Sequence, residues 1–289
     1  MPTESLALTH TVSMPEKKIR LVALDLDGTA LDSRKLMLPG TIRVINEALD
    51  RGIEVVFCTG RTRCQYERFL PDLPKLRYAI CAGGAVVNQV QTREKVISNE
   101  ITVEEMQTIL AVGQRHGCQP VLSIEGDSVH SRAVHENPAL YALEAYTYEL
   151  NHGTICVDDV YAWYEHHQKP VESLALYADI HSRERLIPLR EELERLPLHL
   201  TFPVEPCIEM NRKTADKGKA LLRLCELLGI SREETMTVGD GDNDLTAFRA
   251  AGWAVAMGNA AQRIQQQADA VVADCDHEGV AEAFERFVF

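Results

Sequence analysis

The fold is decided by residues 19–29, which read IRLVALDLDGT. The first six of these residues form an apolar run of the length of a buried strand. Asp25 and Asp27 follow it directly, and open α/β sheets bind their ligands at the carboxyl ends of the strands. Two carboxylates this close repel each other unless a cation or a shared proton offsets the charge. An acidic loop that caps a helix is the alternative interpretation.

Mg²⁺ is the natural partner for such a pair. It is a hard cation that proteins bind through a few carboxylates together with the phosphate oxygens of a substrate. With the cation in place, one carboxylate can act as nucleophile and the other as general acid and base. We therefore take Asp25 and Asp27 as candidate catalytic residues and candidate metal ligands.

Strands and helices alternate on both sides of the middle of the chain. In the first part, Pro39-Gly40 opens a predicted helix, and apolar runs at 53–58 and 78–81 predict two more strands. The last part repeats the pattern, with helices predicted at 217–228, 243–251 and 260–267 and strands at 235–238, 253–257 and 270–273. This alternation predicts an α/β fold, a doubly wound and mainly parallel Rossmann-like sheet with helices on both faces.

Residues 88–207 have a different character. They hold eight of the ten histidines, segments of alternating polar and apolar residues, and predicted helices near 102–116 and 182–195. We therefore expect an α+β cap domain over 88–207, inserted into a core domain made of 18–87 and 208–289. Residues 1–17 are expected to form a flexible N-terminal tail.

The composition excludes several classes of function. Among 289 residues, 43 acidic and 30 basic side chains give a net charge of −13, which disfavours binding to nucleic acid or to an anionic membrane. The chain contains no apolar run of membrane-spanning length and no secretory signal. Eight scattered cysteines without a C-x-x-C pair indicate reduced thiols and a cytoplasmic location.

A second acidic loop, residues 239–244, reads GDGDND and again follows a predicted strand. An EF-hand would need Glu at its twelfth position, where this chain has Ala251. An ordinary solvated turn remains the alternative for this loop taken alone. Because both acidic loops follow strands of one predicted sheet, we expect them to face each other across one crevice.

Two further segments suit a phosphate group. Thr59-Gly60-Arg61 follows the second strand, where a hydroxyl and free backbone N–H groups can bind phosphate oxygens, although a plain helix-capping turn explains it equally well. Lys217 opens a predicted helix, where a cation opposes the helix dipole unless its ammonium group meets an anion elsewhere. A solvated surface lysine is the alternative.

The order of these four segments resembles the haloacid dehalogenase-like hydrolase superfamily, whose motifs are D-x-D-G-T, a Ser or Thr, a Lys, and G-D-x-x-x-D. The likeness is to the Cof-type subfamily, through T-G-R at 59–61, K-G-x-A-L at 217–221 and G-D-G-x-N-D at 239–244. It covers about 18–88 and 208–289, and the insertion resembles the α+β cap by its position and length. Residues 82–84, Ala-Gly-Gly, depart from the usual Asn-Gly-Ala at the cap hinge.

The resemblance implies a role for each motif residue. Asp25 would attack phosphorus to form an aspartyl-phosphate, and Asp27 would protonate the leaving oxygen and then activate water. Mg²⁺ would be bound by the metal residues Asp25, Asp27 (through its main-chain carbonyl), Asp240 and Asp244, the last as ligand or support. The phosphoryl group would be held by Thr59, Gly60, Arg61, Lys217 and Asn243, with Lys217 also counted as catalytic.

The expected function is thus a Mg²⁺-dependent phosphatase of small phosphomonoesters, such as sugar phosphates or similar metabolites. A phosphomutase of the related mannose-phosphate type and a non-catalytic phosphometabolite-binding protein are the alternatives. A degenerate binder has no need to keep the Asp25/Asp27 pair, which favours the enzyme. The expected partner is a small phosphorylated metabolite, with neither nucleic acid nor membrane, and the expected state is a monomer or small homo-oligomer.

The cap carries weaker signals. Its histidines show no H-x-x-x-H spacing, so they are predicted to be solvated or core side chains rather than a second metal site. Glu125-Gly126-Asp127 reads as a hairpin turn, with a substrate-reading loop at the tip of the cap as the alternative.

Overall fold

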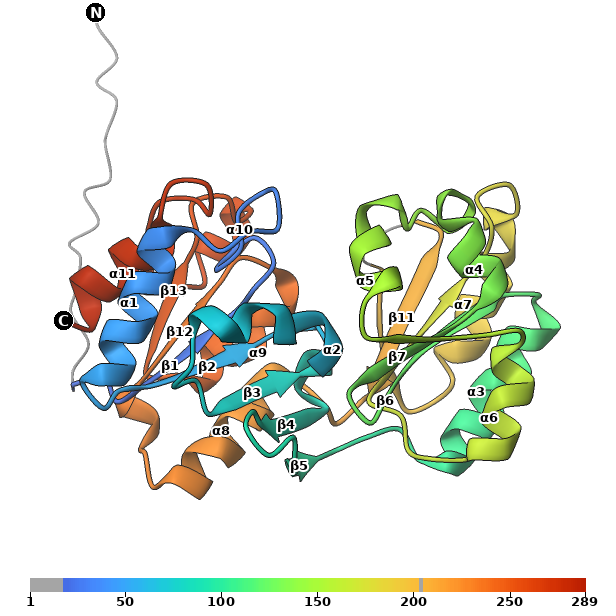
Figure 1. The fold of residues 1–289 in the computed structure, drawn as a ribbon, viewed down its shortest axis with the longest axis horizontal. Helices are drawn as coiled ribbons and strands as arrows, with labels where there is room; N and C mark the ends of the chain where they lie inside the picture. The colour runs from blue at the N-terminus through green and yellow to red at the C-terminus, as the bar shows by residue number, and fades with distance from the viewer. Residues whose placement is uncertain (1–17, 203–204) are drawn as a thin grey trace, which may run out of the picture.

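The computed structural model describes residues 18–202 and 205–289 and divides them between two sheets that lie side by side (Figure 1). The tail expected over 1–17 lies outside the described residues. In the described part of the chain, none of the helices is long and apolar enough to cross a membrane.

The larger sheet has eight strands in the order β14-β13-β12-β1-β2-β3-β4-β5. Its strands are β1 (Leu21–Leu24), β2 (Glu54–Cys58), β3 (Tyr78–Cys81), β4 (Val86–Gln89), β5 (Lys95–Ser98), β12 (Thr235–Gly239), β13 (Trp253–Ala256) and β14 (Ala270–Val271). All neighbouring pairs from β14 to β3 are parallel, and β3-β4 and β4-β5 are antiparallel. The predicted doubly wound, mainly parallel core is confirmed.

Helices cover both faces of this sheet, as the alternation of buried residues requires. The helices are α1 (Pro39–Asp50), α2 (Arg63–Tyr66), α8 (Lys217–Leu228), α9 (Leu245–Ala250), α10 (Gln262–Gln265) and α11 (Gly279–Phe287). Val22 and Leu24 of β1 share one apolar cluster with α1 and α11, whereas Leu21 and Ala23 share another with α8. Period-two alternation along one strand therefore builds two separate cores.

The smaller sheet has six strands in the order β10-β11-β9-β6-β7-β8, and only β7-β8 is a parallel pair. Its strands are β6 (Gln119–Ile124), β7 (Asp127–Ser131), β8 (Thr154–Val157), β9 (Ser173–Tyr177), β10 (Leu198–Thr201) and β11 (Cys207–Arg212). Its helices are α3 (Val103–Arg115), α4 (Arg132–Glu136), α5 (Thr147–Asn151), α6 (Val160–His167) and α7 (Leu186–Leu193). This is the α+β arrangement expected for the cap.

The changes from core sheet to cap sheet and back lie further along the chain than the expected boundaries at 88 and 207. β4 and β5 pair with the core sheet through residue 98, and β11 pairs with the cap sheet through residue 212. The observed boundaries differ from the expected ones because strand pairing, rather than the local sequence pattern, decides to which sheet a strand belongs. By sheet membership, the cap therefore lies between Ser98 and Lys217.

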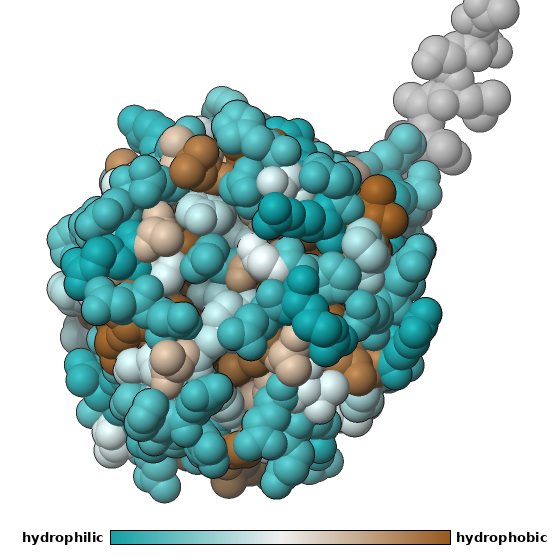
Figure 2. All heavy atoms as spheres, turned by 90° about the vertical axis from the view of Figure 1, so that its right-hand side faces the viewer, coloured by the Kyte–Doolittle hydropathy of each residue, from teal (hydrophilic) through white to brown (hydrophobic). Residues whose placement is uncertain are grey.

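The two faces of the cap sheet are covered to different extents: helices α3, α6 and α7 pack on one face, and the segment from Val134 to Leu150 covers part of the other. Leu122 and Ile124 of β6 belong to an apolar cluster with α3, α6 and α7, while Val121 and Ser123 point to the opposite face. Figure 2, which looks onto the end of the molecule formed by the cap, shows a mainly hydrophilic surface with apolar side chains scattered singly. Single exposed apolar side chains are normal for a folded surface, so this end of the cap gives no sign of a binding site.

Candidate active site

Three neighbouring strands bring the predicted residues together. Asp25 and Asp27 follow β1, Thr59 follows β2, and Asp240 follows β12, and these strands are parallel neighbours in the order β12-β1-β2. Since carboxyl ends of parallel strands meet at one edge of a sheet, the two acidic loops face each other as predicted. The Thr29 hydroxyl donates to Oδ1 of Asp240 at 2.9 Å and joins them directly.

Lys217, the first residue of α8, binds two buried carboxylates, which offsets its unfavourable position at a helix N-terminus. Its ammonium group donates to Oδ1 of Asp25 at 2.8 Å and to Oδ1 of Asp244 at 2.6 Å, and its side chain is 1% exposed. Burial alone would lower the pKa of Lys217, but Asp244 and Asp25 outweigh it and raise that pKa above its usual value. The lysine is therefore a buried permanent cation between two carboxylates rather than a solvated surface residue.

The buried carboxylates outnumber this cation. Ligand oxygens of Asp25, Asp240 and Asp244 lie within 4.8 Å of one another. Burial, and next the charge of Asp244, raise the pKa of Asp25 to about 8, and burial raises that of Asp240 to about 6. Three carboxylates against one ammonium leave an excess of two negative charges, which a divalent cation would offset. The donor set thus fits a hard divalent metal.

The loop after β12 holds these carboxylates in position. The backbone N–H groups of Asp240 and Gly241 donate to Oδ2 of Asp244 at 3.0 and 2.9 Å. The Asn259 side chain donates to Oδ2 of Asp240 at 3.2 Å and to the Gly28 carbonyl at 2.8 Å. Gly28 has φ +78°, and a Cβ there would lie 2.4 Å from Oδ2 of Asp240, so only glycine fits between the two loops.

Asp27 points away from the carboxylate cluster. Oδ2 accepts from Nε of Arg61 at 2.8 Å, and Oδ1 accepts from Nη2 of Arg61 at 2.9 Å and from Nζ of Lys35 at 2.8 Å. Although burial acts in the opposite direction, the hydrogen bonds and charge of Arg61, with Lys35, lower the pKa of Asp27 to about 2. Arg61, predicted to bind phosphate, therefore pairs with the second carboxylate of the D-x-D motif.

The core site forms one end of a cavity of about 300 Å³. Asp25, Asp27, Thr59, Gly60, Arg61, Asp240 and Asn243 all line it. The inner face of the cap sheet lines the other side through alternate residues of three strands, Val121, Ser123, Ser173, Ala175, Cys207 and Glu209. The cavity-lining face of the cap sheet therefore lies opposite the reactive residues.

The cap hinge shows the effect of the Ala-Gly-Gly departure. The Ala82 carbonyl accepts from the side-chain amide of Asn211, a residue of the cap strand β11, and Ala82 has φ +48°. Gly84 lies so close to the start of α8 that a Cβ would come within 2.3 Å of the Asp216 carbonyl. This segment therefore contacts the cap on one side and fixes the helix that carries Lys217 on the other.

The substrate-reading interpretation of Glu125-Gly126-Asp127 is wrong in this structure. The segment is the hairpin turn between β6 and β7, and neither carboxylate is among the cavity-lining residues of the described chain. Asp127 Oδ1 accepts from Nη2 of Arg63 on α2 at 3.1 Å, and both Oε atoms of Glu125 accept from Lys169 at 2.7 Å. The turn is a contact between cap and core.

Sequence reasoning missed two residues of the site. Lys35 reaches Asp27 from a left-handed backbone position with φ +62°, which no local pattern reveals. Glu209 lies in the cavity wall, and burial raises its pKa. The alternation Cys207-Ile208-Glu209-Met210 was a usable signal, because Ile208 and Met210 are core residues and Glu209 must then face the other way.

Comparisons with known proteins agree with this geometry. The haloacid dehalogenase-like hydrolase family matches residues 22–284. A phosphatase of Bacillus subtilis is 29% identical over 279 residues, covering 91% of this chain and 98% of that protein. A pyridoxal phosphate phosphatase of Escherichia coli is 25% identical over 282 residues, with 91% and 96% covered.

Solved structures are similar over the same length. A haloacid dehalogenase-like hydrolase from Bacteroides thetaiotaomicron superimposes with a TM-score of 0.81 at 25% identity, covering 93% of this chain and 99% of the other. One from B. subtilis gives a TM-score of 0.78 at 26% identity, with 92% and 99% covered. With three motifs lining one cavity, the fourth joined to them through Lys217, and the match spanning core and cap, the chain belongs to the haloacid dehalogenase-like hydrolase family and is a phosphatase of that family.

Proposed function

We propose that this enzyme is a Mg²⁺-dependent phosphatase that hydrolyses small phosphomonoesters through an aspartyl-phosphate on Asp25. The observation that carries the proposal is the buried excess of negative charge at one end of the cavity. Asp25, Asp240 and Asp244 lie close together, and the ammonium group of Lys217 contacts two of these three carboxylates, those of Asp25 and Asp244. A substrate phosphate adds further negative charge there, so the site needs a cation before it can bind one.

The residues present fit Mg²⁺. The carboxylates of Asp25 and Asp240 and the main-chain carbonyl of Asp27 would hold it, with Asp244 in support. When bound, the cation supplies charge stabilisation for the phosphoryl oxygens and orients them. Lys217 counteracts the rise that burial causes in the pKa of Asp25, and it holds that carboxyl in position through its hydrogen bond to Oδ1.

Asp25 and Asp27 divide the covalent work. A carboxylate oxygen of Asp25 forms a bond to phosphorus as the bond to the ester oxygen breaks, and Asp27 gives that oxygen a proton. Water then attacks phosphorus, Asp27 takes its proton, and the bond between Asp25 and phosphorus breaks. Asp27 is suited to the second step as it stands, because Arg61 and Lys35 hold it ionised. In the first step the incoming phosphate competes for these two cations, which raises the pKa of Asp27.

The cavity favours a small substrate. At about 300 Å³ and bounded by the cap sheet, it accommodates a metabolite-sized ester but not a folded phosphoprotein. The relatives include phosphatases named for pyridoxal phosphate and for 5-amino-6-(5-phospho-D-ribitylamino)uracil. A phosphorylated small metabolite, of the sugar-phosphate kind or similar, is therefore the proposed substrate class.

The test is hydrolysis of p-nitrophenyl phosphate by the purified enzyme. Activity is expected to require Mg²⁺ and to vanish with excess EDTA. Asp240→Asn should weaken the cation site, so its activity should recover partly at high Mg²⁺, whereas Asp242→Asn, whose exposed carboxylate pairs with Arg263, should behave like the wild type. Full activity in excess EDTA would refute the metal dependence.

A further inference from the structure

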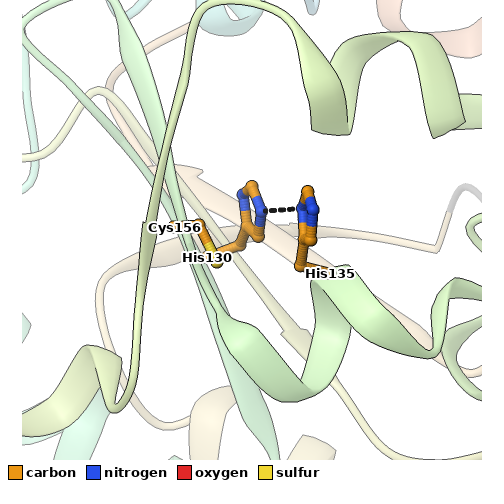
Figure 3. A group of neighbouring side chains, drawn as sticks. All are labelled: His130, His135 and Cys156. Carbon is orange, nitrogen blue, oxygen red and sulfur yellow. Dashed lines mark hydrogen bonds between the residues drawn. The ribbon is translucent and has the colours of Figure 1, made fainter.

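A second group of metal-ligating side chains lies in the cap. One ring nitrogen of His130, one of His135 and Sγ of Cys156 lie within 4.8 Å of one another. Figure 3 shows the two imidazole rings side by side, His130 on β7 and His135 on α4, with Cys156 on the adjacent strand β8. His130 and Cys156 are register partners in the β7-β8 pair, so their side chains project from the same face.

The spacing of the two imidazoles suits a shared cation. Nε2 of His130 lies 3.2 Å from Nδ1 of His135. In tetrahedral Zn²⁺ sites with Zn–N bonds of about 2.0–2.1 Å, two nitrogen ligands lie about 3.3–3.4 Å apart. A nitrogen ligand and a thiolate sulfur lie about 3.6 Å apart. Cys156 is exposed, so its side chain is free to rotate and close the remaining gap.

The two imidazoles share one hydrogen bond, between Nε2 of His130 and Nδ1 of His135, and a cation bound to these two nitrogens would replace it. His130 is 0% exposed, and its Nδ1 makes no hydrogen bond with any residue in the described ranges.

We propose that His130, His135 and Cys156 form a second cation site that takes a borderline-soft divalent ion, Zn²⁺ above all. Two imidazoles and one thiolate are ligands for Zn²⁺ and poor ligands for Mg²⁺, so this site is chemically distinct from the carboxylate cluster. The exposed side of Cys156 leaves room for water as the fourth ligand.

The site has a consequence for the cavity. His135 on α4 and Cys156 on β8 lie at the two ends of the segment 137–153. Leu143, Tyr146 and Leu150, all in that segment, line the cavity. An ion bound to both ends would tie this part of the cavity wall to β7 and reduce its motion.

Cobalt and zinc titrations test the site without relying on activity. Co²⁺ is added to the metal-free protein in the presence of excess Mg²⁺, which fills the carboxylate site. One equivalent should give the near-ultraviolet thiolate-to-cobalt band and the visible bands of tetrahedral Co²⁺, and Zn²⁺ should displace it. Cys156→Ser and His135→Gln should lose the bands or weaken binding by at least about 10–100-fold, the loss that even outer-shell partners cause.

Matched controls separate this site from incidental binding. Cys64→Ser and His166→Gln change a cysteine and a histidine away from the cluster and should titrate like the wild type. Neither Cys156 nor His135 belongs to the apolar clusters, so both variants are expected to fold, which circular dichroism checks. Binding that is unchanged in Cys156→Ser, or the absence of a thiolate band in the wild type, would overturn the site. If Zn²⁺ did not slow hydrogen exchange in 138–151, the proposal that the ion restrains this part of the cavity wall would be overturned.

Discussion

The core and the cap use a sheet in opposite ways. In the core both faces of the sheet are packed against helices, so polar side chains gather where strands end: Asp25 after β1, Thr59 after β2 and Asp240 after β12. In the cap one face is packed and the other lines the cavity, so functional side chains lie along the strands, as Glu209 does. Under the proposed function, reaction chemistry would belong to strand ends and substrate choice to a strand face.

The largest effect is expected from Asp25→Asn. An amide cannot form the phosphoryl bond, so turnover should be lost for every phosphate ester, whatever its leaving group. Steady-state kinetics over several esters provides the measurement, with Asp242→Asn as the control for an acidic residue of the neighbouring loop. If Asp25→Asn kept activity toward some esters and not others, the proposal that the core supplies the chemistry for every substrate would be contradicted.

Asp27→Asn should cost less. The nucleophile remains, and the loss of acid and base help typically lowers kcat about 10²–10⁴-fold. Because a good leaving group needs little protonation, the loss should be smaller for p-nitrophenyl phosphate than for a sugar phosphate. An equal loss for both esters would contradict the role of Asp27 as the general acid.

Glu209→Gln tests the cap face. Glu209 lines the cavity opposite the reactive residues, so its substitution should change the ranking of substrates by kcat/KM by about 10-fold, the size of one altered polar contact. Metal dependence should not change. Glu125→Gln, on the hairpin turn outside the cavity, is the matched control and should leave the ranking intact. Equal losses for all substrates in Glu209→Gln would contradict a selective role.

The buried carboxylates of the core should make the metal-free enzyme sensitive to pH. The pKa of Asp25 is raised by burial to about 8, so the folded state binds a proton that the unfolded state has lost, and stability falls as pH rises from about 4 to about 8. Thermal unfolding in EDTA at about pH 5 and about pH 8 measures this fall, which Asp25→Asn should reduce and Mg²⁺ should counteract. An identical pH dependence of Tm in wild type and Asp25→Asn would contradict it.

Lys35→Met should have the smallest effect. Lys35 is one of two residues whose hydrogen bonds and charge lower the pKa of Asp27, so its removal should move that pKa upward from about 2 toward the ordinary value. Steps that need ionised Asp27 are lost as pH falls through its pKa, so the acidic limb of the pH–rate profile should shift to higher pH. Lys169→Met, which removes a cation paired with Glu125, should leave the limb in place.

The sequence predicted the core better than the cap for a physical reason. The strand at 78–81 and the helix at 217–228 have the bounds expected, because apolar runs and periodicity are local signals that Ala82-Gly83-Gly84 and Gly229 interrupt clearly. The sheet to which β4, β5 and β11 belong depends on pairing with distant segments, which no local pattern contains.

The same distinction applies within the site. Asp25, Thr59 and Asp240 were predictable because each follows a strand directly. Lys35 was not predictable, because it reaches Asp27 through a turn with positive φ. Nothing in the sequence around Lys35 distinguishes it from the rest of the 30 Lys and Arg residues. The proximity of His130, His135 and Cys156 was not predictable either, since it depends on the register of β7 and β8 and on the position of α4.

Asp25 is proposed to carry the phosphoryl group during turnover. The most direct measurement is a rapid-quench reaction with substrate followed by borohydride, which reduces an aspartyl-phosphate to homoserine, and peptide mass spectrometry to locate the change. We expect homoserine at position 25 in the wild type and none in Asp25→Asn. Homoserine at position 27, or turnover without homoserine at either position while a chemically phosphorylated control protein is reduced normally, would contradict it.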